Sequence, residues 1–88
     1  MKTEYEYIRF EKDEMLSDGK DTNYYYCMNK KSGKDLGFVK WNPALRQYCF
    51  FTNTNGIFDY YAFSAGCLKD IIYFIEQLMA KRKREVGE

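Results

Sequence analysis

Residues 64–84 read SAGCLKDIIYFIEQLMAKRKR, and this stretch decides the fold. Its apolar residues recur at the three- and four-residue spacing of one helical face, at Leu68, Ile71, Ile72, Ile75, Leu78 and Met79. Ser64 is a good N-cap because its hydroxyl can accept a hydrogen bond from a free amide of the first turn. The pattern predicts an amphipathic helix over about residues 65–83, with a basic tail at 81–88 where the helix dipole favours cations.

The sequence before this helix has the composition of short strands separated by turns. Aromatic and β-branched residues concentrate at 4–12, 24–28, 36–41, 46–52 and 57–63. The polar stretch 11–23 is expected to be a loop. We therefore predict an α+β fold, an antiparallel four- or five-stranded β-meander followed by one C-terminal amphipathic helix packed on one sheet face. Residues 1–88 are too few for two cores, so we expect a single domain with its strands within 4–63.

The composition excludes most catalytic chemistry. The chain has 14 Lys and Arg, 13 Asp and Glu and no His, so it lacks the side chain that titrates near neutrality and commonly binds catalytic zinc. Cys27, Cys49 and Cys67 lie among apolar residues and form no Cys-x-x-Cys pair, which is typical of buried thiols rather than of a metal site. We expect no enzyme activity, no cofactor, no metal and no small-molecule substrate.

Membrane insertion is not expected either. No apolar stretch approaches the roughly 20 residues that span a bilayer, and the acidic start of the chain does not resemble a signal peptide. The sequence therefore predicts a cytoplasmic protein without a membrane partner.

Basic residues interleave with aromatic ones in the middle of the chain. This combination favours single-stranded nucleic acid, because cations follow the phosphates while rings stack on the bases. The candidate binding residues are Lys30, Lys31, Lys40, Trp41, Arg46 and Tyr48. The same composition also fits a solvated hairpin with ordinary core aromatics. The first functional hypothesis is a non-catalytic interaction module that binds single-stranded nucleic acid through this basic aromatic hairpin.

Both faces of the predicted sheet carry aromatic residues. One helix is about 10–12 Å across, whereas four or five strands make a sheet roughly 15–20 Å wide, so the helix leaves apolar surface uncovered. The alternative hypothesis is therefore protein–protein interaction or assembly through the helix-free face, with Tyr25 and Phe51 as interface residues. A homodimer is the simplest such assembly.

Three motifs from Leu36 onward resemble a group of small proteins carried by bacteriophages and integrated mobile elements. The motifs read LGFVKW at 36–41, RQYCF at 46–50 and CLKDIIYF at 67–74. They match, in order, the Leu-Gly-x-Val-Lys-Trp, Arg-x-Tyr-x-Phe and Cys-Leu-x-x-Ile patterns of that group. The chain departs from the group at Leu45, which stands in place of a tryptophan, and at Thr52, which stands in place of a proline. The resemblance implies the order of sheet and helix and a phage or mobile-element origin, and it implies no enzymatic activity.

Overall fold

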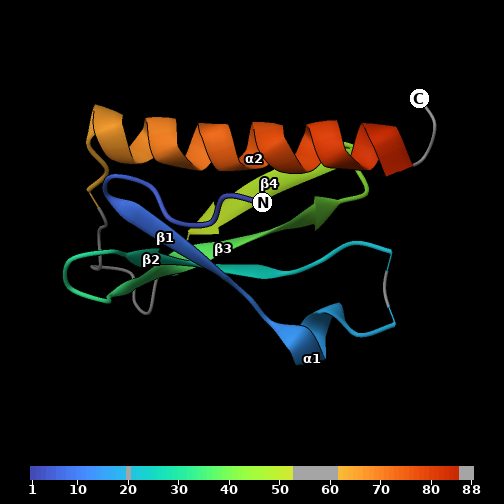
Figure 1. Ribbon diagram of the computed structural model, residues 1–88, viewed down its shortest axis with the longest axis horizontal. Coiled ribbons are helices and arrows are strands. Elements are labelled where there is room, and N and C mark those ends of the chain that lie inside the picture. The colour runs from blue at the N-terminus through green and yellow to red at the C-terminus, as the bar shows by residue number, and fades with distance from the viewer. Residues whose placement is uncertain (20, 53–61, 86–88) are drawn as a thin grey trace.

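The fold is an antiparallel sheet covered on one face by a long C-terminal helix (Figure 1). The computed structural model describes residues 1–19, 21–52 and 62–85. Four strands lie side by side in chain order: β1 (Ile8–Lys12), β2 (Tyr25–Asn29), β3 (Asp35–Asn42) and β4 (Gln47–Thr52). Helix α2 (Ala65–Glu85) packs against β4 and β1. This arrangement confirms the predicted α+β fold and the order of its elements.

Local structure departs from the sequence prediction at two places. The stretch predicted as a loop contains a short helix, α1 (Glu14–Ser17), because the Asp13 carboxylate caps it by accepting a hydrogen bond from the Leu16 amide at 2.8 Å. The first strand begins only at Ile8. The predicted strand at 57–63 lies mostly outside the described residues, and residues 62–64 belong to no strand.

Helix α2 begins and runs as its sequence pattern predicts. The Ser64 hydroxyl accepts a hydrogen bond from the Cys67 amide at 3.1 Å, so Ser64 is the N-cap. The helix continues to Glu85, two residues beyond the predicted end. No helix within the described ranges is long and apolar enough to cross a membrane.

The core is centred on Phe74 of α2, which is completely buried. Its ring stacks on Phe10 of β1 with centroids 3.9 Å apart, and it meets Tyr5 and Tyr25 edge to face. Cys27 is also completely buried, and this burial raises the pKa of its thiol to about 12. The helix therefore covers the sheet face that carries Phe10, Tyr25 and Cys27.

Two polar side chains of α2 attach the N-terminal segment to the helix. The buried Asp70 carboxylate accepts hydrogen bonds from the backbone amides of Tyr7 at 2.8 Å and Ile8 at 3.2 Å. Two turns later, the Gln77 amide both donates to the carbonyl of Lys2 and accepts from its backbone amide, each at 2.8 Å. These contacts satisfy backbone groups of the N-terminal segment, which bends at residues 6 and 7 so that Glu4 forms an antiparallel bridge with Arg9 of β1.

Asp70→Ala should destabilise the protein by about 2–4 kcal/mol, because it leaves two amides at the helix–sheet junction without an acceptor. Asp70→Asn keeps one acceptor oxygen and should lose about half as much. Urea unfolding followed by circular dichroism measures both values. Equal stability of the Ala variant and the wild type would show that Asp70 does not hold the segment.

Gly37 is required where β3 passes β4. Its φ is 151°, and a Cβ atom at this position would lie 2.1 Å from the Phe51 carbonyl oxygen. The nearest ring atoms of Phe50 would be only 3.1 Å away. The close approach of the two backbones therefore depends on the absence of a side chain at residue 37.

Gly37→Ala should cost about 2–4 kcal/mol, because it combines backbone strain with a clash against the neighbouring strand. The matched control is Gly33→Ala in the β2–β3 turn, where φ is 74° but no atom lies within 4 Å of the added Cβ. This control variant should lose only the stability that backbone strain costs, about 1–2 kcal/mol. Equal losses in the two variants, measured by urea unfolding, would rule out the clash.

Candidate functional site

The six residues predicted to bind nucleic acid do not form one surface. Lys30 and Lys31 lie at the turn between β2 and β3, whereas Arg46 lies in the turn between β3 and β4. Because these turns are at opposite ends of the eight-residue strand β3, about 26 Å separates them. The structure therefore does not bring the six residues together, because the shared strand β3 holds the two turns apart.

Lys30 has a structural partner instead. Its ammonium lies 3.3 Å from the Glu4 carboxylate and donates a hydrogen bond to the Tyr5 carbonyl at 3.2 Å. These contacts tie the turn to the N-terminal segment. Lys31 is exposed at the same turn.

The other four predicted residues lie towards the opposite end of the sheet, where two of them, Lys40 and Trp41, line a pocket of about 380 Å³. We call it the Trp41 pocket. Its walls come from α1, the segment before β2, and the end of β3 with the following turn. The lining residues are Leu16, Thr22, Asn23, Tyr24, Lys40, Trp41 and Pro43. Lys40 and Trp41 both line the pocket, although as neighbours in β3 they point to opposite faces of the sheet, and Tyr48 contacts Trp41 from the neighbouring strand.

Trp41 is held between β4 and α2. The Tyr48 ring meets it edge to face, with centroids 5.4 Å apart. The guanidinium of Arg82 lies 4.1 Å from the centre of the indole ring, a cation–π contact that covers one face of the ring. Sequence analysis placed Arg82 only in a basic tail. Its position four residues after the buried Leu78, on the stripe that faces the sheet, is the signal that could have identified it.

The opposite wall of the pocket is fixed by α1. The Tyr24 amide donates to the Ser17 hydroxyl at 2.9 Å, and the Tyr24 carbonyl accepts from the Asp13 amide at 2.9 Å. Ser17 is buried, although it is polar, because it makes this contact. The short helix that sequence analysis missed therefore positions Tyr24 and carries Leu16 to the pocket.

A row of three rings continues from the pocket across the helix-free sheet face. We call Tyr24, Phe38 and Phe51 the aromatic row. Phe38 stacks on Tyr24 and on Phe51, each with centroids 5.0 Å apart. The Lys40 ammonium lies 5.8 Å from the Phe38 centroid and 5.4 Å from that of Phe51. Lys40 thus stands over the row and beside the Trp41 pocket.

Tyr25 does not belong to this face, so its prediction as a helix-free interface residue is wrong. It pairs with Val39 and contacts Phe74 beneath α2, where only 2 % of its surface is exposed. Adjacent residues of a strand point to opposite faces, and it is Tyr26 that pairs with Phe38 on the helix-free side. Phe51 pairs with Phe38 and lies on the face that was predicted for it.

The phenols around the site are held neutral. The Tyr26 hydroxyl donates to the Asp13 carboxylate, which raises the pKa of Tyr26 to about 12. Burial, followed by the negative charge of Asp35, raises the pKa of Tyr24. Hydrogen bonds from Leu16 and Tyr26 lower the pKa of Asp13. The charges beside the pocket are therefore carried by carboxylates and by the cations Lys40 and Arg82.

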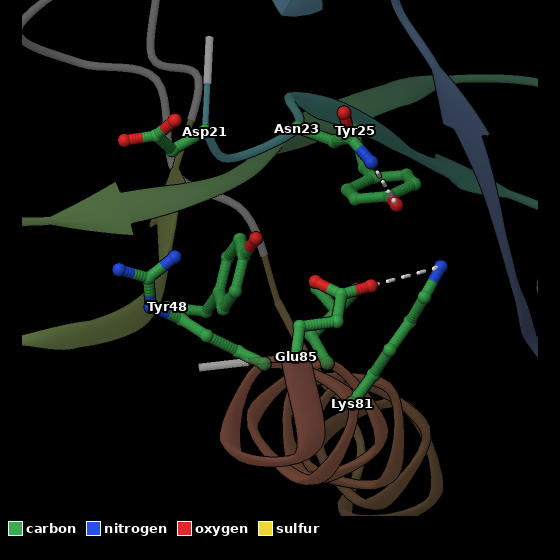
Figure 2. A pocket seen from close by; sticks show the side chains of 8 residues that line it. Asp21, Asn23, Tyr25, Tyr48, Lys81 and Glu85 are labelled. Carbon is green, nitrogen blue, oxygen red and sulfur yellow. Dashed lines mark hydrogen bonds and ion pairs between the residues drawn. The ribbon is translucent and has the colours of Figure 1, made fainter. Parts of the chain in front are cut away.

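A second, smaller cavity lies on the helix side of Asn23 (Figure 2). Its volume is about 30 Å³, which suits a single water molecule. Asn23 donates to the Tyr25 hydroxyl at 3.2 Å, and Lys81 lies 4.0 Å from Glu85. Asp21, Tyr48, Leu78 and Arg82 complete the lining. This cavity is a polar joint between the sheet and the end of α2 rather than a ligand pocket.

Comparison with known proteins identifies a phage relative. The chain is 34 % identical over 79 residues to an uncharacterised 9.3 kDa protein of Acholeplasma phage L2, and the alignment covers 90 % of this chain and 92 % of that protein. No protein-family model and no solved structure matches the chain. The extent of the alignment supports the phage-like character predicted from the three motifs. The chain therefore belongs to the same family as this protein of Acholeplasma phage L2.

Proposed function

We propose that this protein binds single-stranded nucleic acid, with one unstacked base in the Trp41 pocket. The observation that carries the proposal is the meeting of an indole, a phenol and an exposed ammonium in one concave site. Its volume, about 380 Å³, lies within the range of small-ligand sites. Base stacking on aromatic side chains together with phosphate contacts by cations is the usual chemistry of single-strand binding.

The charge around the pocket supports the proposal. Lys40 lines the pocket, Arg46 lies in the adjoining β3–β4 turn, and Arg82 contacts Trp41 from α2. Lys81, Lys83 and Arg84 add further cations at the end of the same helix. Asp13, Asp21 and Glu85 offset part of this charge, and Glu85 pairs with Lys81. These six cations therefore lie towards one end of a chain whose net charge is only +1.

Single strands fit the site better than duplexes do. A base can enter the pocket that Trp41 and Tyr24 line only when it is unstacked and unpaired. The aromatic row does not offer the same opportunity, because the central ring, Phe38, is already stacked on both of its neighbours. We therefore assign base contact to the pocket and phosphate contact to Lys40 and Arg46, with Arg82 orienting the indole.

Binding of a short oligothymidylate should quench the fluorescence of Trp41, which is the single tryptophan of the chain. Affinity should fall as salt rises, because phosphate contacts release counterions. Lys40→Gln should weaken binding and reduce the salt slope by about one unit. Titrations at several salt concentrations measure both quantities.

The matched control is Lys31→Gln, which removes an exposed lysine at the far end of β3 and should leave the affinity unchanged. A duplex of the same length should bind more weakly than the single strand. Absence of quenching at low salt, or equal losses from the Lys31 and Lys40 variants, would reject the proposed site.

A further inference from the structure

The most exposed apolar cluster in the described part of α2 lies on its outer face, away from the sheet. Leu68, Ile72 and Tyr73 are 47 %, 52 % and 56 % exposed. By contrast, Tyr24, Phe38 and Phe51 on the helix-free sheet face are half-buried, since they cover one another. Among the described residues, these three side chains on the outer face of α2 are therefore more exposed than the aromatic row on the helix-free sheet face. The width of the sheet had predicted the larger exposed apolar surface on the helix-free face.

The charges that flank this cluster have a symmetric arrangement. Lys69, Ile72, Tyr73 and Glu76 are all exposed, and their spacing of three and four residues places them on one patch of the helix surface. Lys69 precedes Ile72 by three residues, and Glu76 follows Tyr73 by three. Among the described residues, neither Lys69 nor Glu76 has an ion-pair partner.

We propose that the protein forms a homodimer in which two α2 helices pack antiparallel through this patch. A two-fold axis between Ile72 and Tyr73 places Ile72 against the partner's Tyr73. The same axis places Lys69 opposite the partner's Glu76, and this ion pair occurs twice. The apolar centre and both charges are therefore satisfied by a second copy of the same surface.

A parallel arrangement lacks this complementarity. It would set Lys69 against the partner's Lys69 and Glu76 against the partner's Glu76, and like charges at such distances repel. The charge order thus selects the antiparallel pair and disfavours the alternative. The patch is small, so the expected Kd lies between about 1 µM and 1 mM.

Sedimentation velocity on the full chain over this concentration range tests the proposal. The wild type should change from 10.6 kDa to twice that mass as concentration rises. Ile72→Glu should weaken the dimer at least about tenfold, because it places a charge in the apolar centre. Ile72 is exposed, so circular dichroism should report an unchanged fold.

Charge reversal tests the antiparallel register. Lys69→Glu and Glu76→Lys should each weaken the dimer about tenfold, because each creates two like-charge contacts. The double variant restores opposite charges across the axis, so its Kd should return to within about threefold of the wild-type value. Recovery in the double variant also shows that neither single variant fails merely through misfolding.

Two control variants separate this dimer from other associations. Leu45→Glu changes an apolar residue that is 60 % exposed in the β3–β4 turn, and it should leave the dimer intact. Phe51→Lys alters the helix-free face and should also leave the dimer intact, with circular dichroism reporting the fold of the variant. The proposal is overturned if the wild type stays monomeric, if Ile72→Glu still dimerises normally, or if the double variant remains as weak as the singles.

Discussion

The stacking of Phe74 on Phe10 is the contact on which the rest of the structure depends. It joins the last helix to the first strand, with ring centroids 3.9 Å apart, and Tyr5 and Tyr25 complete the cluster edge to face. Once Phe74 is fixed, the helical rise places Arg82 about 12 Å further along the axis. At that distance Arg82 reaches Trp41 at the end of β3. The core therefore sets the geometry of the candidate site.

The elements with strong periodicity could be predicted from sequence, and those held by tertiary contacts could not. Helix α2 has an apolar stripe and a serine cap, so both its existence and its start were clear. Helix α1 has only four residues and depends on Asp13 as its cap. A helix of one turn is too short for apolar residues to recur at helical spacing, so its sequence carries no periodic pattern.

The assignment of residues to the two sheet faces shows a further limit. Tyr24–Met28 is apolar throughout, so alternation could not indicate which rings lie beneath the helix. The structure resolves this point by pairing Tyr25 with Val39 and Tyr26 with Phe38. Lys40 and Trp41 were predicted as binding residues from their types and their proximity in sequence. The pocket that they line is completed by Leu16, which was expected to lie in a loop, and by Tyr24, which follows that loop. Composition can suggest the chemistry of a site, whereas only the fold brings its walls together.

The two proposals are linked by the geometry of α2. In an antiparallel pair centred between Ile72 and Tyr73, each Arg82 lies about 14 Å along the axis from the centre, on opposite sides. The two Trp41 pockets would then lie towards opposite ends of the dimer, each beside its own cluster of cations. One flexible strand that reached both pockets would bind the second at high effective concentration, so its affinity would exceed that of a strand too short to span them. In a monomeric variant that keeps the pocket intact, longer oligonucleotides would then bind no more tightly than short ones. This result distinguishes avidity across two pockets from additional contacts that a longer strand makes with one protein molecule.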